Sequence, residues 1–285
     1  LPGYEPLIDM ADIIKVDFRI TEDPEERKRL REILPGHVRL LAEKIETEEE
    51  FHQALEYGYV LFQGYFFCKP VVLHKKKLTS NALSQIRLLK EVNRQDFDFS
   101  AIINVISSDT NLVHKLLTYI NSVGIGLTYH ISNLRQAAVL LGSGGMRRWV
   151  TLISLQTFSE DKPPELFTIS LLRAKFCELI AHEIKRPDLT PDTGFLLGMF
   201  SLLDVLLSQP MEEVLKEVGL SSELNAALLG EDNILRHVLD LVIAYEQGDW
   251  DKVIACCRRE NIPVEHLQPC YDEVLKWYNT LQTVR

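Results

Sequence analysis

Short apolar runs alternate with charged stretches along the first quarter of the chain. Three of these runs are rich in β-branched and aromatic residues, which is typical of strands. They lie at residues 12–18, 38–45 and 59–66. The stretches between them are long enough for one helix each. We therefore predict the order strand, helix, strand, helix, strand in this region.

The two intervening helices carry recognisable start signals. Pro24 suits the first turn of the helix predicted at residues 24–34. Thr47 can cap the next helix, with Glu50 as its capping-box partner. Strands joined through helices are expected to be parallel with right-handed crossovers. Such strands need cover on both faces, so we expect them to pack on the rest of the chain or on a second copy.

After Pro70 the apolar positions follow a helical period and no β-alternation returns. Gly142 is expected to end one of these helices. The predicted helical runs lie at residues 83–92, 112–120, 134–141, 146–158, 166–184, 193–207, 211–217, 223–229, 234–246, 250–259 and 265–281. The predicted fold class is α+β and mostly α: a short βαβαβ part followed by an all-α part.

Composition describes a globular protein with a sizeable core. The 285 residues are 46% hydrophobic, and the net charge is −10 at pH 7. A strongly acidic chain argues against a broad nucleic-acid or anionic-membrane surface. The longest apolar stretch, residues 194–207, contains Ser201 and Asp204 and is too short to span a bilayer. We expect no membrane partner and no nucleic-acid partner.

The five cysteines form no Cys-x-x-Cys pair, and their number is odd. This pattern favours buried, inert thiols in a reducing compartment, and we expect a cytoplasmic protein. The first residue is Leu1 and not Met, so we expect the sequence to be a fragment of a longer protein.

Three motifs in the first 75 residues resemble the last strands of an EAL domain. These motifs are Asp12-x-x-Lys15-Val-Asp17, Ala42-Glu43-Lys44-Ile45-Glu46-Thr47, and Phe62-Gln63-Gly64-Tyr65 with Lys69-Pro70. The resemblance implies a (β/α)₈ barrel that hydrolyses cyclic di-GMP with two metal ions. Catalytic residues of such barrels lie at the carboxyl ends of the strands, where the strand prediction also places Lys15, Glu43 and Gln63.

This chain departs from the EAL pattern in ways that affect catalysis. It contains no Glu-Ala-Leu tripeptide, and Lys44 stands where the family has Gly between two glutamates. The ligands that the family draws from earlier strands are missing. Two-metal hydrolysis needs several converging oxygen ligands. We therefore interpret Lys15, Glu43, Glu46 and Gln63 as relics of a site, with no catalytic residue and no cofactor.

The helical part, roughly residues 78–282, resembles an HDOD domain, a relative of the HD-GYP phosphodiesterases that lacks their catalytic residues. The motifs that carry this resemblance are Ile120-Asn121-Ser122, Ala137-Ala138, Leu141-Gly142, Arg147-Arg148-Trp149, Gly198-Met-Phe-Ser201-Leu-Leu-Asp204, Ala227-Leu228-Leu229, Tyr245-Glu246, Gly248-Asp249-Trp250, Tyr271 and Trp277-Tyr278. The order of an EAL part and an HDOD part resembles the YuxH-type family of bacterial signal-transduction proteins.

The metal ligands of an HD hydrolase are also missing. Ser201-Leu202 stands where the family pattern places His-Asp, and the nearest substitutes are His182, Glu183 and Asp204. These three are weak metal candidates, and the alternative is an ordinary solvated or capped helix face.

Arg147, Arg148 and Trp149 form a candidate interaction surface, since exposed Trp beside Arg is common at protein interfaces. In the alternative interpretation, Trp149 lies in the core and the arginines are solvated.

These observations predict a partial EAL domain at residues 1–75 and an HDOD domain at residues 76–285. Our first hypothesis is a non-enzymatic interaction or output module in bacterial signal transduction. Its partner would be a signalling protein, such as an upstream receiver or sensor domain, and a homodimer is an alternative. The second hypothesis is a cyclic di-GMP phosphodiesterase in a longer chain. The third is cyclic di-GMP binding without hydrolysis.

Overall fold

The computed structural model describes residues 3–64, 78–94, 96, 98–122 and 130–283. The chain divides into two compact units, residues 1–70 (unit 1) and residues 71–285 (unit 2). Several residues of the sequence motifs lie outside the described ranges: Tyr65, Cys68, Lys69 and Pro70.

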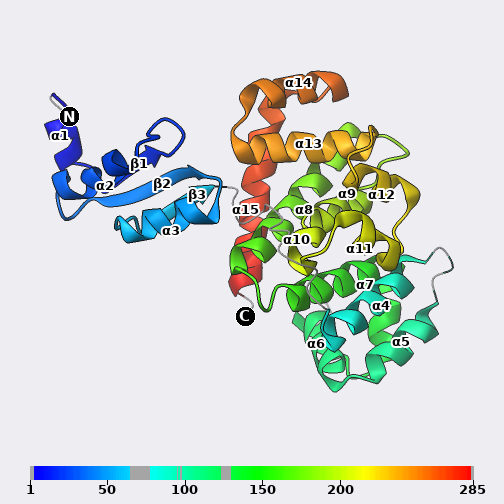
Figure 1. The fold of residues 1–285 in the computed structure, drawn as a ribbon. Coiled ribbons are helices and arrows are strands. Elements are labelled where there is room, and N and C mark those ends of the chain that lie inside the picture. Colours follow the sequence, from blue (N-terminus) through cyan, green and yellow to red (C-terminus); the bar gives the residue numbers. More distant parts are fainter. Residues whose placement is uncertain (1–2, 65–77, 95, 97, 123–129, 284–285) are drawn as a thin grey trace. The chain divides into compact units, whose positions relative to one another are not determined.

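Unit 1 contains a three-stranded parallel sheet with the strand order β1-β2-β3 (Figure 1). Its elements are α1 (Glu5–Asp9), β1 (Ile13–Asp17), α2 (Pro24–Ile33), β2 (Arg39–Ile45), α3 (Glu48–Glu56) and β3 (Leu61–Gly64). The predicted parallel strands are confirmed. The predicted start signals are also present, because Pro24 opens α2 and the Thr47 hydroxyl accepts a hydrogen bond from the Glu50 amide at 3.1 Å.

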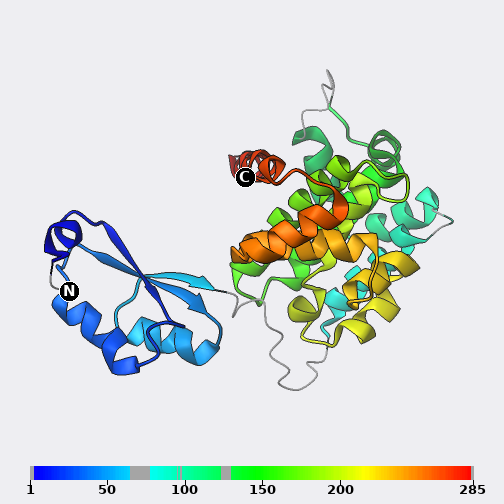
Figure 2. The same cartoon turned by 90° about the horizontal axis from the view of Figure 1, so that it is seen from above.

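Helices α2 and α3 cover the same face of the sheet, as two right-handed crossovers between consecutive strands require (Figure 2). This face carries Val16, Leu40 and Ala42, which are buried in the core of unit 1. The alternating residues point to the opposite face. They include Lys15, Leu41 and Leu61, which lie side by side in the strand register and are exposed or half-buried.

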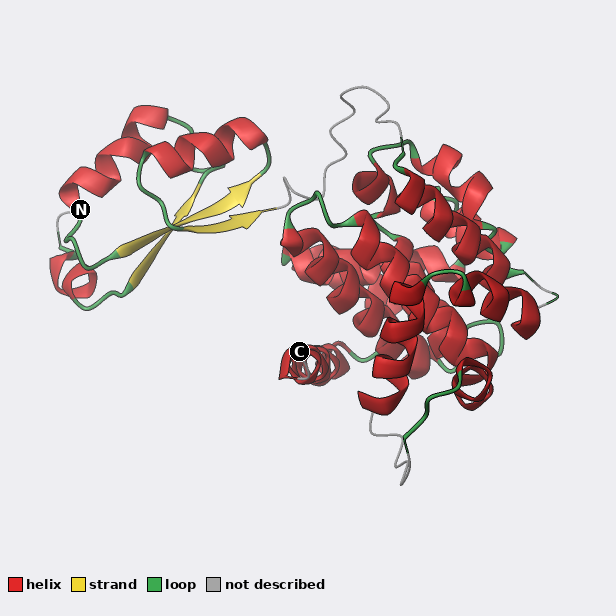
Figure 3. Ribbon diagram, turned by 90° about the horizontal axis from the view of Figure 1, so that it is seen from below, coloured by secondary structure: helices red, strands yellow, loops and turns green. Residues whose placement is uncertain are grey.

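Unit 2 is helical throughout its described residues (Figure 3). Its elements are α4 (Ser80–Asn93), α5 (Phe99–Ser107), α6 (Thr110–Ser122), α7 (Leu134–Phe158), α8 (Pro164–Ile184), α9 (Pro191–Phe200), α10 (Leu203–Leu207), α11 (Met211–Val218), α12 (Ser222–Leu228), α13 (Ile234–Gln247), α14 (Trp250–Glu260), the short 3₁₀ helix η2 (Val264–His266) and α15 (Leu267–Thr283). No helix in the described part of the chain is both long enough and apolar enough to cross a membrane.

One predicted helix end is confirmed, and one predicted helical run differs from the structure. Gly142 interrupts the helical backbone of α7 with φ of 67° and ψ of −177°, so that two helical stretches meet at a kink there. A residue without a Cβ adopts such angles easily. The single run predicted at residues 193–207 is two helices, because Leu202 leaves the helical conformation between α9 and α10.

The backbones of α8 and α9 approach each other closely at two glycines of α9. A Cβ on Gly194 would lie 2.6 Å from the Cys177 carbonyl oxygen. A Cβ on Gly198 would lie 2.4 Å from the Ala174 Cα. Both distances are shorter than any van der Waals contact, so only glycine allows this crossing.

We predict that Gly198→Ala lowers the free energy of unfolding of unit 2 by about 2–4 kcal/mol, because α8 and α9 must separate to admit the methyl group. Urea unfolding followed by circular dichroism measures this change. Gly144→Ala in α7 is the control, since its Cβ would meet only the exposed Asp192 carboxylate, at 3.3 Å. The control should be neutral or slightly stabilising. Equal losses in both variants would contradict the close-packing argument.

Candidate functional site

The strand register of unit 1 brings together three of the sequence-predicted site residues. Lys15 pairs with Leu41 in the register, and Glu43 pairs with Gln63. All three candidates therefore share the sheet face opposite α2 and α3, near the carboxyl ends of the strands. Glu46 follows β2 directly.

The carboxylates at this edge are paired with basic side chains from unit 1. Glu43 Oε1 lies 3.5 Å from Lys15 Nζ. Asp17 accepts a hydrogen bond from Lys44 Nζ at 2.5 Å, and this bond is the main cause that lowers the pKa of Asp17. Glu46 forms an ion pair with Arg19. The three ion pairs link the ends of β1 and β2.

Lys44 has a left-handed backbone conformation, with φ of 59°. The pairing of β2 with β3 shifts by one residue between Glu43 and Ile45, so Lys44 is the extra residue of a β-bulge. Gly is the residue that fits such a position without strain. The left-handed backbone suits the Gly that the EAL resemblance implies at this position. Lys44 of this chain instead places an ammonium group beside Asp17.

These residues do not fit the two-metal centre that the EAL resemblance implies. Such a centre needs several oxygen ligands that converge on both ions. Here Asp17, Glu43 and Glu46 each have a cationic partner. Within the described residues, no group of three or more His, Cys, Asp and Glu side chains is arranged to hold a metal ion.

The main polar cluster of unit 2 is a buried ion pair that sequence analysis missed. Arg173 of α8, with 3% of its side chain exposed, donates to Glu246 of α13 through Nε at 3.1 Å and through Nη2 at 2.7 Å. Arg173 Nη1 also donates to the Ser201 hydroxyl at 2.9 Å. Ser201 in turn donates to the Gly198 carbonyl oxygen at 2.7 Å. The Ser201 hydroxyl thus has partners within the protein, and it lies at the position where the resemblance to HD hydrolases implies a metal-binding His.

The thiol of Cys177, close to this cluster, is fully buried. Burial raises the pKa of Cys177 far above its usual range. Burial likewise raises the pKa of the thiols of Cys256, Cys257 and Cys270. All four described cysteines are free. Thiols held in the protonated form are poor nucleophiles, which agrees with the inert thiols predicted from the sequence.

The candidate surface of Arg147, Arg148 and Trp149 is corrected by the structure. Trp149 is 1% exposed and lies in the core, so it is unavailable to a partner. Arg147 Nε donates to the Val92 carbonyl oxygen at 3.0 Å. Arg148 binds Glu178 at 2.5 Å and lies 4.0 Å from the centre of the Phe195 ring. Both arginines therefore tie α7 to neighbouring helices.

The weak metal candidates are likewise not brought together as a site. Glu183 contacts His266, whose Nδ1 lies 2.8 Å from Glu183 Oε2. Asp204 lies in α10, where burial raises its pKa. His182 is exposed near the end of α8. The Glu183–His266 contact joins residues 83 positions apart, so local sequence patterns give no sign of it.

Asn121, one of the motif residues of the HDOD resemblance, has a structural role. Its amide nitrogen donates to the Ile131 carbonyl oxygen at 2.8 Å, and its amide oxygen accepts from the Ile131 amide at 2.8 Å. The side chain therefore pairs with the backbone as a strand would, and it joins the end of α6 to the segment that leads into α7.

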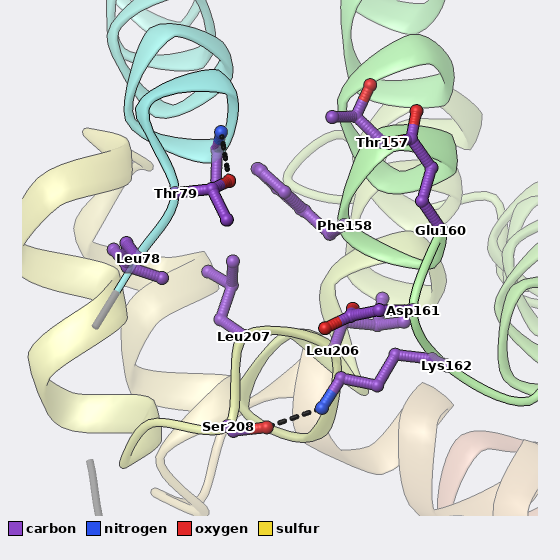
Figure 4. A pocket seen from close by; sticks show the side chains of 11 residues that line it. Leu78, Thr79, Thr157, Phe158, Glu160, Asp161, Lys162, Leu206, Leu207 and Ser208 are labelled. Carbon is purple, nitrogen blue, oxygen red and sulfur yellow. Dashed lines mark hydrogen bonds between the residues drawn. The ribbon is translucent and has the colours of Figure 1, made fainter. Parts of the chain in front are cut away.

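Unit 2 has an open pocket of about 170 Å³ between the start of α4, the end of α7 and the end of α10 (Figure 4). Phe158, Leu206 and Leu207 supply apolar walls, and Lys162 donates a hydrogen bond across the opening to Ser208. The Thr79 hydroxyl caps α4 through the Ala82 amide, at 3.1 Å. The described lining contains no His or Cys, so it offers neither an imidazole base nor a thiol nucleophile.

Unit 2 is thus a helical domain with a buried ion pair between α8 and α13, and Ser201 is hydrogen-bonded to the arginine of that pair. The HDOD domain family model matches residues 79–237, and the chain belongs to this family. No solved structure matches the chain significantly.

Two curated relatives align with nearly the whole chain. The uncharacterized protein YuxH of Bacillus subtilis is 35% identical over 285 residues, which are 99% of this chain and 68% of YuxH. The cyclic di-GMP phosphodiesterase CdgJ of Vibrio cholerae is 32% identical over 279 residues, which are 97% of this chain and 64% of CdgJ. The chain thus spans about two thirds of the length of each relative.

We predict that Lys44→Gly is more stable than Lys44→Ala by about 1 kcal/mol, because both variants lose the ion pair with Asp17 but only Gly relieves the left-handed backbone. Urea unfolding of unit 1, followed through a fluorescent label placed there, measures the difference. Equal stability of the two variants would show that the bulge carries no strain.

The Arg173–Glu246 pair should behave as a coupled buried unit. We predict that Arg173→Met and Glu246→Leu each lower the free energy of unfolding by about 3–5 kcal/mol, while the double variant loses less than the sum. Urea unfolding of all four proteins completes the cycle. Arg186→Met, which breaks the exposed pair with Asp188, is the control and should change stability little. Strictly additive losses would show that the two buried charges are uncoupled.

Proposed function

We propose that this chain is a non-enzymatic signalling module whose helical unit acts through binding to other proteins. The observation that carries the proposal is the Arg173–Glu246–Ser201 cluster. A hydrolase of the HD type needs metal ligands there, and this chain has a satisfied ion pair and a hydroxyl. The side chain of Leu202, next to Ser201, has no atom that can bind a metal ion.

The strand ends of unit 1 support the same proposal. Lys15, Lys44 and Arg19 neutralise the carboxylates that a barrel enzyme of the EAL type would present to metal ions. Unit 1 would then be a remnant that connects unit 2 to an input, such as a receiver or sensor domain of a longer protein. An input would change the arrangement of the two units and so expose or cover a helical surface.

A second function is favoured by a different observation. CdgJ is named a cyclic di-GMP phosphodiesterase, and Lys15, Glu43 and Gln63 share one face at the strand ends in this chain. A protein extended to the length of its relatives would supply further strands and ligands. In such a protein these three residues would form one side of a site that binds or hydrolyses cyclic di-GMP.

Nucleotide turnover separates the two functions. We expect the purified chain of residues 1–285 to leave cyclic di-GMP intact in the presence of Mg²⁺ or Mn²⁺, as measured by chromatography of the products. Metal-dependent turnover that Glu43→Gln abolishes would overturn the non-enzymatic proposal. Glu49→Gln, which changes an exposed carboxylate of α3, is the matched control and should have no effect in either case.

The same assay on a protein of full family length tests the second function. Loss of turnover in Lys15→Ala, with normal turnover in Lys28→Ala, would support catalysis through the strand ends. Saturable binding of cyclic di-GMP without turnover, measured by calorimetry, would instead support a nucleotide sensor.

A further inference from the structure

An aromatic cluster that reaches the surface joins α13, α14 and α15. The ring centre of Tyr245 lies 5.6 Å from that of Trp250 and 5.3 Å from that of Tyr271. Buried Phe176 lies beneath both tyrosines, with ring-centre distances of 5.2 and 5.5 Å. We call Tyr245, Trp250 and Tyr271 the aromatic patch.

Trp250 is the unusual member of this patch, because 56% of it is exposed. A large aromatic side chain gains free energy when it is covered, and exposed Trp is enriched where partners bind. Ile254, one turn further along α14, is also exposed and extends the apolar surface. The contact between Trp250 and Tyr245, whose planes meet at 79°, holds the indole at the edge of a rigid cluster.

The surroundings of the patch are acidic. Asp249 and Asp251 flank Trp250 and are exposed, and exposed Asp272 follows Tyr271. Asp272 is close enough to Tyr245 to contribute to the raised pKa of its phenol, after the larger effects of burial and Tyr271. Glu246 adds little net charge, because Arg173 neutralises it.

The basic residue nearest to Trp250 in the sequence lies on another side of α14. Lys252 follows Trp250 by two positions, which is about 200° around the helix. It therefore lies on the side of α14 opposite the indole. An aromatic surface rimmed by carboxylates attracts cations through both ring quadrupole and charge.

We propose that the aromatic patch and Asp272 bind an arginine-bearing segment of a protein partner. The guanidinium group would stack on the aromatic rings and pair with the Asp272 carboxylate, while apolar neighbours of the arginine would cover Ile254. Arginine suits this surface better than lysine, because its planar group stacks on rings and pairs with carboxylates at the same time. The proposal rests on the proposed function of unit 2 as an interaction module and specifies its partner.

Calorimetry of the full chain with capped nonapeptides tests the proposal. Each peptide consists of Gly, Ser and Leu around a central Arg, Lys, citrulline or Glu. We expect the Arg peptide to bind at least about tenfold more tightly than the citrulline and Glu peptides, with Lys between them. Trp250→Ala should weaken Arg-peptide binding about tenfold, and Asp272→Asn should weaken it less and reduce its salt dependence.

Val139→Ala, which trims another exposed apolar side chain of unit 2, is the matched control and should leave binding unchanged. If Trp250→Ala fails to fold, Trp250→Phe and Asp272→Asn decide the question. Any one of three results would overturn this proposal. They are the absence of saturable Arg-peptide binding, equal binding of the Arg and citrulline peptides, and normal binding by the patch variants. None of these results would alter the nucleotide-turnover test, so failure here leaves the proposed function to be judged separately.

Discussion

The crossing of α8 and α9 at glycine is the constraint on which the rest of unit 2 depends. Gly198 allows the α9 backbone to touch the α8 backbone at Arg173 and Ala174. Ser201 lies three residues further along and is therefore placed within 2.9 Å of Arg173 Nη1. A bulkier residue at position 198 would move Ser201 away from the guanidinium group. The close crossing thus fixes both the helix packing and the polar cluster within it.

The buried arginine then determines how α13 attaches. Arg173 is 3% exposed, and a guanidinium group so far from water needs a carboxylate partner. Glu246 is this partner, and it accepts a bidentate pair of hydrogen bonds from the guanidinium group. Because Glu246 is fixed, its neighbour Tyr245 is held against Phe176 and Tyr271, and Trp250 is left at the surface of this cluster. A single chain of contacts therefore runs from the helix crossing to the aromatic patch.

Local signals predicted the features that depend on neighbouring residues. The parallel strands, the Thr47 cap and the inert thiols follow from spacing and composition. Contacts between distant residues were not predictable in this way. Arg173 and Glu246 are 73 positions apart, and the pattern around Trp149 suits an interface as well as a core. The break after α9 was also missed, because an apolar sequence continues through Leu202 although the backbone changes direction.

Basic side chains pair with carboxylates in the polar clusters of both units. Lys15 pairs with Glu43 and Lys44 with Asp17 in unit 1, and Arg173 pairs with Glu246 in unit 2. Such ion pairs hold strand ends and helices in place without any bound ion. In unit 2 the pair is buried, so the removal of one partner leaves an uncompensated charge in a poorly solvated interior. These ion pairs therefore have a structural role of their own, and in our proposal the exposed aromatic patch is the part of unit 2 that binds a partner.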